Sequence, residues 1–143
     1  MRSIELTDTP INLVADELQI PILGFIAAGA PLEPYTDPNA TISIPPSFMS
    51  GQKRTFVLQV RGESMIEEQI RDGDFVIIEQ TEDAQNGEIV VALLDNGMAT
   101  LKRFFRESTR VRLEPANAKM SPIFAKNVRI QGKVVGLIRR YKN

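Results

Sequence analysis

Two residues of this chain could together carry hydrolytic chemistry: a serine in a turn and a lysine in a strand. The chain contains neither histidine nor cysteine, which excludes Ser-His-Asp triads, thiol nucleophiles, disulfides and thiolate metal sites. The remaining route to nucleophilic catalysis is a serine activated by a neutral lysine. Ser64 follows a strand-like run and Gly62, where backbone N–H groups could face an oxyanion. Lys102 lies mid-strand between Leu101 and Phe104, and burial there would lower its pKa from about 10.4.

Taken alone, these residues also have more ordinary explanations. The segment Ser64–Arg71 is predicted to be helical, with Ser64 as its cap and Glu67 at the capping-box position. A lysine in a strand commonly extends its ammonium group into solvent. Asp72 and Asp74 flank a glycine, a pattern that favours a turn over a metal site.

The elements that must position these residues are short β-rich runs separated by turn signals. Their spacing of roughly 8–12 residues predicts an all-β body of the barrel or sandwich type. Alternation within one run places Met98, Thr100, Lys102 and Phe104 on one face. The predicted strands are Thr55–Val60, Phe75–Ile78, Glu88–Leu94, Ala99–Phe104, Val111–Glu114, Val128–Gly132 and Lys133–Arg139.

The first part of the chain differs from the rest in composition and periodicity. Residues 1–19 show no sustained helical or strand period and are interpreted as a linker or mobile arm. Residues 20–38 carry six Pro or Gly breakers, which favours an extended, exposed segment over a helix. No apolar run approaches the roughly 18 residues that span a bilayer, and the N-terminus has no signal-peptide pattern. We therefore expect a cytoplasmic protein that does not associate with a membrane.

Charge is distributed unevenly along the sequence. Residues 1–95 hold 16 acidic and 5 basic residues, net −11, whereas residues 96–143 hold 2 acidic and 12 basic residues, net +10. A basic final third could meet nucleic acid. Because the basic residues are scattered through strand-like segments, we expect instead that they pair with acidic strands on a mixed surface.

Several motifs, taken in order, resemble the self-cleaving LexA-type peptidase domain, a family that includes UmuD and phage repressors. The resemblance covers about residues 20–143. Phe25 stands where another member of the family carries a basic residue. The matching motifs are Ile20–Pro31, Gly62-Glu63-Ser64-Met65, Asp72-Gly73-Asp74, Asn86-Gly87, Leu101-Lys102-Arg103 and Gly132–Arg139.

The resemblance implies a fold and a set of site residues. The fold would be mainly β, a small, strongly bent sheet or barrel-like domain with one short helical turn after the nucleophile. The peptidase domain would span residues 20–143, with a cleavage segment at 20–33. Ser64 would be the nucleophile, Lys102 the general base and Ala28–Gly29 the scissile bond, without metal or cofactor. Backbone N–H groups of Ser64 and Glu63 would bind the oxyanion, with the Glu63 side chain facing solvent.

The resemblance also implies a biological role. The chain would be the C-terminal portion of a homodimeric transcription repressor of the SOS DNA-damage response. A RecA-type recombinase filament on single-stranded DNA would stimulate cleavage and so inactivate the repressor. Operator DNA would be bound only through a helix-turn-helix domain that this chain lacks. The alternatives are a UmuD-like accessory protein of a translesion polymerase, a catalytically inactive β interaction module and a relative of signal peptidases.

Overall fold

The fold is one long, bent β-sheet. The computed structural model describes residues 17–49 and 53–141. The strands follow one another in the sheet in the order β2-β1-β4-β5-β10-β6-β7-β8-β9, and β3 pairs with β1. The sheet is not closed into a barrel, and the prediction of a mainly β, strongly bent-sheet or barrel-like domain is confirmed. The elements are β1 (Leu18–Ala27), β2 (Glu33–Pro34), β3 (Thr41–Ile44), the 3₁₀ turn η1 (Pro46–Phe48), β4 (Thr55–Arg61), η2 (Ile66–Glu68), β5 (Phe75–Gln80), β6 (Ile89–Leu94), β7 (Ala99–Arg106), β8 (Val111–Glu114), β9 (Ile123–Ala125) and β10 (Val128–Ile138).

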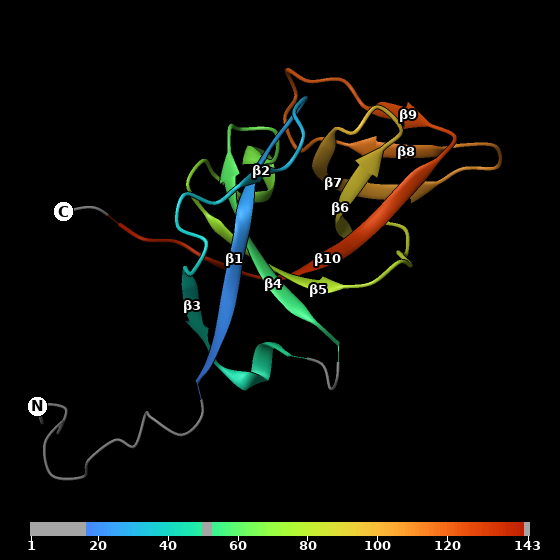
Figure 1. Cartoon of the computed structure of the whole chain (residues 1–143). Coiled ribbons are helices and arrows are strands. Elements are labelled where there is room, and N and C mark those ends of the chain that lie inside the picture. Colours follow the sequence, from blue (N-terminus) through green and yellow to red (C-terminus); the bar gives the residue numbers. More distant parts are fainter. Residues whose placement is uncertain (1–16, 50–52, 142–143) are drawn as a thin grey trace, which may run out of the picture.

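Strand β10 joins the two halves of the sheet. In Figure 1 it runs from the group β6–β9 to β5 and β4. Its first part pairs with β6 and its last part with β5, and the register shifts between Ile130 and Gly132 on the β6 side and between Val134 and Gly136 on the β5 side. The two strands predicted over 128–132 and 133–139 are therefore one continuous strand. Bulges of this kind bend a strand, which lets one chain segment serve both halves.

Two local predictions require correction. Residues 20–38 were expected to be extended and exposed; the first part is extended as β1, but Ile20, Ile22 and Ile26 are buried. The expected helix over 64–71 is reduced to the three-residue turn η2, and no side chain caps it. Glu67 instead accepts a hydrogen bond from the Ala118 N–H at 2.7 Å. The predicted mobile arm, apart from its last residues, lies outside the described residues.

Three apolar clusters form the core, and the first of them fixes the geometry of the site region. It joins Ile26 of β1, Met65 of the turn after β4, and Ala99 and Leu101 of β7. The cleavage segment, the Ser64 turn and the Lys102 strand thus share one packed cluster. The other two clusters lie around β1, β3 and β5 and around β6, β7 and β8.

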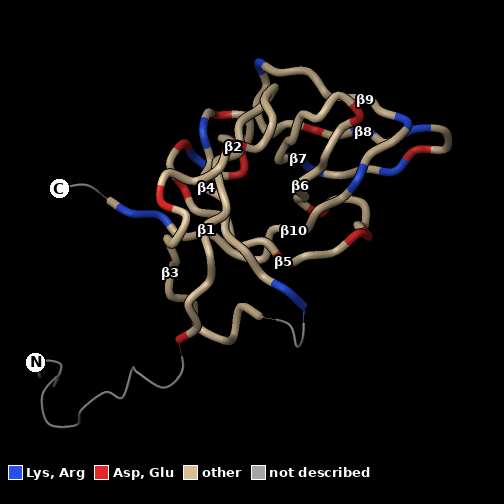
Figure 2. The backbone as a smooth tube through the Cα atoms, in the orientation of Figure 1, with Lys and Arg blue, Asp and Glu red and all other residues tan. Residues whose placement is uncertain are grey.

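The uneven charge along the sequence becomes a mixed surface in three dimensions. Acidic residues are interspersed among the basic ones of the later strands (Figure 2). Arg103 pairs with Glu68, Lys133 with Glu88, and Arg139 with Asp74. The basic final third therefore pairs with the acidic part, as expected. No helix in the described ranges is long and apolar enough to cross a membrane.

Substitution of Gly132 by alanine tests the place where β10 passes from its pairing with β6 to its pairing with β5. A Cβ there would meet the Ile78 side chain and lie 2.7 Å from the carbonyl oxygen of Glu79. We expect Gly132→Ala to lower the free energy of unfolding by about 1–3 kcal/mol, measured by urea denaturation. The control is Gly136→Ala, where the Cβ would meet no backbone atom but the ring of Phe48, a partly exposed side chain that can rotate away, and Cδ1 of Ile77 at 3.1 Å, so the loss should be smaller. An equal loss in both variants would contradict this account of the crossover.

Candidate active site

The Ser64 turn is held at both ends by hydrogen bonds from outside it. Strand β4 ends at Arg61, and the next N–H, that of Gly62, donates to Oδ1 of Asp72 at 2.8 Å. The Asn117 side-chain amide donates to the Glu63 carbonyl oxygen at 2.8 Å. Glu63 itself is exposed, as expected, and Ser64 is half-buried. The turn is therefore fixed by its backbone, which leaves the serine hydroxyl free of a structural role.

The donors expected for an oxyanion are available. Within the described part of the chain, the N–H groups of Glu63 and Ser64 have no hydrogen-bond acceptor. The Glu63 carbonyl accepts from the Ile66 N–H at 3.3 Å, which tightens the turn without using those two donors. Free backbone donors beside a nucleophile can stabilise a developing negative charge.

Lys102 is buried, and no carboxylate of the described residues is paired with it. It is 1% exposed, and its Nζ donates to Oγ1 of Thr100 at 2.6 Å and to the Leu101 carbonyl oxygen at 3.2 Å. Because burial removes the hydration of the ammonium group, the pKa of Lys102 falls to about 8. The expectation of a desolvated lysine with a lowered pKa is confirmed.

Sequence reasoning missed the role of Thr100. Alternation placed it on the Lys102 face but assigned it no function. Its hydroxyl is the closer of the two acceptors around Nζ, and it is itself buried. A polar residue two positions before a buried lysine on the same face was the signal that could have identified it.

The expected cleavage segment lies between β4, which leads to the Ser64 turn, and β7, which carries Lys102. β1 runs parallel to β4, and Ala27 is the register partner of Arg61. Beyond the turn, the carbonyl of Ala30 accepts from the Ala99 N–H of β7 at 3.0 Å. Ala28 and Gly29 are exposed between these two anchors, and Gly29 has a φ of +74°, which only glycine adopts readily.

The structure thus brings the segment, the Ser64 turn and β7 together, but it does not join the dyad. The hydrogen bonds of Lys102 Nζ described above go to Thr100 and Leu101, and none of them reaches Ser64. A direct hydrogen bond between Ser64 and Lys102 would therefore require a movement of one of the two side chains.

Asp72 and Asp74 have structural roles in this region. Asp72 anchors Gly62, and Asp74 receives two hydrogen bonds from Arg139 at 2.7 Å each and one from the Arg71 N–H at 2.8 Å. Burial opposes ionisation of Asp74, but the bonds from Arg139 and Arg71 outweigh it, so its pKa lies below the usual value. Both aspartates thus hold the turn that supports the Ser64 loop.

Replacing Lys102 by methionine tests its burial. The unfolded chain binds the lysine proton up to a pKa near 10.5, but the folded chain loses it near 8, so folding becomes more favourable as pH rises between these values. Below pH 8 the buried ammonium destabilises the fold by about 3 kcal/mol. We expect Lys102→Met to be more stable than its parent at pH 7, with the gain disappearing by pH 10.5. Urea denaturation in a Ser64→Ala background measures this, with Lys126→Met as the exposed control; equal gains in both would contradict it.

A family model and several known proteins match this chain. The model of the family described as Peptidase S24-like matches residues 21–135. A LexA repressor of Syntrophomonas wolfei is 48% identical over 96% of this chain and 66% of its own length. A LexA repressor of Koribacter versatilis is 52% identical over 85% of this chain and 58% of its own length.

A third relative, the LexA repressor of Clostridium botulinum, is 44% identical over 98% of this chain and 68% of its own length. The chain therefore spans about two thirds or less of the length of these relatives. The family model covers most of the chain, including the cleavage segment, the Ser64 turn and β7. The chain belongs to the Peptidase S24-like family, and it is similar to LexA repressors over most of its length.

Proposed function

We propose that this chain cleaves its own Ala28–Gly29 bond with a Ser64–Lys102 dyad. The observation that carries the proposal is the anchoring of residues 27–30 between β4, which leads to Ser64, and β7, which carries the buried lysine. Holding the bond and the nucleophile on one chain gives a high effective concentration.

The proposed reaction begins with transfer of the Ser64 hydroxyl proton to neutral Lys102. A neutral amine has two N–H bonds, and the bonds to Thr100 and Leu101 use both. The lone pair of Nζ then remains for the proton of Ser64 once the two side chains approach. Thr100 is thus a positioning residue for the base.

The remaining steps follow from this transfer. Oγ of Ser64 attacks the carbonyl carbon of Ala28, and the N–H groups of Glu63 and Ser64 stabilise the oxyanion. Lys102 then gives its proton to the nitrogen of Gly29, which leaves as a new N-terminus. Water hydrolyses the Ser64 ester, which restores the hydroxyl and leaves a carboxylate on Ala28.

The biological role that we propose is that of the C-terminal part of a LexA-type repressor in the SOS response, a cytoplasmic homodimer. The three relatives described above are LexA repressors, which supports this role over that of a UmuD-like accessory protein. Cleavage would inactivate the repressor. A recombinase filament on single-stranded DNA would promote it by binding more tightly to the state in which the segment is docked. Operator binding would come from a part of the protein outside this chain.

Purified protein at alkaline pH should yield two fragments, the second beginning at Gly29. Ser64→Ala and Lys102→Ala should each abolish the reaction while the fold remains intact. Because a dyad acts as one unit, the double variant should be no worse than either single variant. Mass spectrometry identifies the new ends and circular dichroism checks the fold.

Lys126→Ala, a surface substitution, is the control and should cleave normally. The first-order rate constant should not change on dilution, since the reaction is within one chain. A break at another bond, or appreciable cleavage by Lys102→Ala, would overturn the assignment.

The pH dependence of cleavage should report the titration of Lys102. With a pKa of about 8, about a tenth of the lysine is neutral at pH 7, against about 0.04% at a solvent-like pKa. The rate should rise about tenfold per pH unit below the apparent pKa and level off above it. An activator that favours docking should raise the rate most near neutrality. A flat profile from pH 6 to 10 would remove Lys102 from the role of base.

A further inference from the structure

At the outer edge of the cleavage segment, two contacts of Arg61 and one between aromatic rings form a cluster. Nη1 of Arg61 lies 2.7 Å from Oε2 of Glu33 in β2. Its guanidinium carbon lies 3.6 Å from the ring centroid of Phe25 in β1. The Phe25 ring in turn lies 4.9 Å from that of Tyr35. One side chain of β4 therefore contacts both strands of the segment.

The register of the sheet explains why these contacts meet. Phe25 and Glu33 are direct partners across β1 and β2, and β1 runs parallel to β4 up to Ala27 opposite Arg61. Arg61 is also the last residue of β4 before the turn to Ser64. The cluster thus ties the segment to the strand end that positions the candidate nucleophile.

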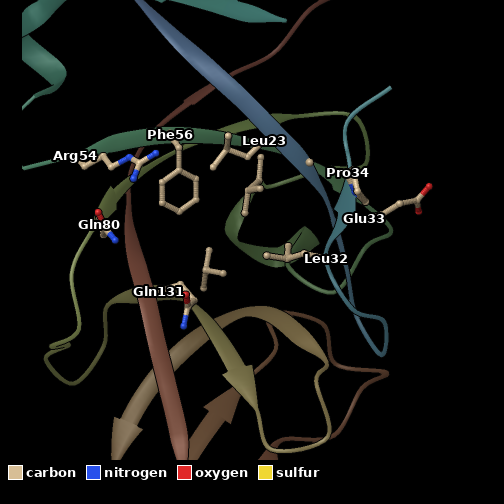
Figure 3. A pocket seen from close by; sticks show the side chains of 11 residues that line it. Leu23, Leu32, Glu33, Pro34, Arg54, Phe56, Gln80 and Gln131 are labelled. Atoms are coloured by element: carbon tan, nitrogen blue, oxygen red, sulfur yellow. The ribbon is translucent and has the colours of Figure 1, made fainter. Parts of the chain in front are cut away.

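Below the segment, packing is incomplete. A cavity of about 370 Å³ separates Leu23 and Leu32 of the segment from Phe56, Leu58 and Val91 of the body. Figure 3 shows the apolar side chains around this space, with Glu33 pointing away from it. Leu23 is 48% and Leu32 40% exposed. These two leucines are only partly buried, so contacts at the outer edge add to the docking of this part of the segment.

We propose that Arg61 is a positioning residue that latches the part of the segment beyond β1 in its docked place, through Glu33 of β2 and Phe25 near the end of β1. The proposal rests on the proposed self-cleavage, because docking brings the scissile bond to Ser64. It also assigns a role to Phe25, whose ring receives the cation from β4. The latch sets the fraction of molecules that are docked and leaves the chemistry of the dyad unchanged.

The Ala99 amide of β7 donates to the Ala30 carbonyl oxygen of the segment. Its hydrogen exchange therefore reports docking in a protein that cannot cleave. In the uncleavable Ser64→Ala background, Arg61→Ala should lower its protection about threefold to tenfold, as expected for loss of an exposed ion pair and a cation–π contact. Amides of β5, in the centre of the sheet, should keep their protection. The control is Arg129→Ala, an exposed arginine elsewhere on the sheet.

Single-contact variants separate the two parts of the latch. Glu33→Gln removes only the ion pair and Phe25→Leu only the ring, so each should have part of the effect of Arg61→Ala. The charge exchange Arg61→Glu with Glu33→Arg should restore part of the protection. High salt should weaken docking in the parent but not in Glu33→Gln.

With Ser64 present, the rate of cleavage at pH 7 should fall in the same order as the protection of Ala99. Unchanged protection of Ala99 in Arg61→Ala would overturn the latch, and would mean that the ion pair is merely a surface contact. Loss of protection without any cleavage in the parent protein would support the latch and overturn the proposed function. Equal loss in Arg129→Ala would also overturn the latch.

Discussion

Burial of the Lys102 amino group without a carboxylate is the constraint on which the candidate site depends. An ammonium group taken out of water is strongly disfavoured unless a negative charge accompanies it. Here only a hydroxyl and a carbonyl accept from it. The pKa therefore falls to about 8, which makes the neutral amine accessible near physiological pH. A carboxylate at this place would stabilise the charged form and remove the base.

The rest of the fold maintains that dry environment and brings the other parts to it. The first core cluster packs Ile26, Met65 and Leu101 together, so one set of apolar contacts positions the cleavage segment, the Ser64 turn and β7. The Asp74–Arg139 pair and the Asp72–Gly62 bond then fix the Ser64 turn from the side. These charged groups stabilise the turn at the margin of the site. None of them forms a hydrogen bond with the Lys102 amino group.

The first part of the cleavage segment is held firmly in the sheet, and its second part is held weakly. β1 is firmly held, since alternate side chains are buried and it pairs with β2, β3 and β4. The part beyond Ala27 has one exposed leucine, Leu32, over the cavity and one isolated bridge, from Ala30 to Ala99. A segment held in this way can undock locally without unfolding of the sheet. Regulation of self-cleavage would then act on the weak part.

The sequence alone indicated the candidate residues and most of the strands. The absence of histidine and cysteine restricted nucleophilic catalysis to a serine with a lysine, the resemblance to the LexA-type family pointed to Ser64 and Lys102, and the alternation of side chains indicated most of the strands. The turn Asp95-Asn96-Gly97 separates two of the predicted strands, which pair as the antiparallel strands β6 and β7. These features are local, because they depend on residue type and on spacing within one element.

Only the tertiary structure decided how these elements meet. The helix predicted over 64–71 shrank to one 3₁₀ turn because Glu67 bonds to the Ala118 N–H, more than 50 positions away. The breaker-rich cleavage segment became a half-buried strand because β3 and β4 supply its partners. The contacts of Arg61 with Phe25 and Glu33 join three strands whose register no local pattern encodes. Long-range pairing and burial depend on the whole sheet, and so they overrode the local preferences of the sequence.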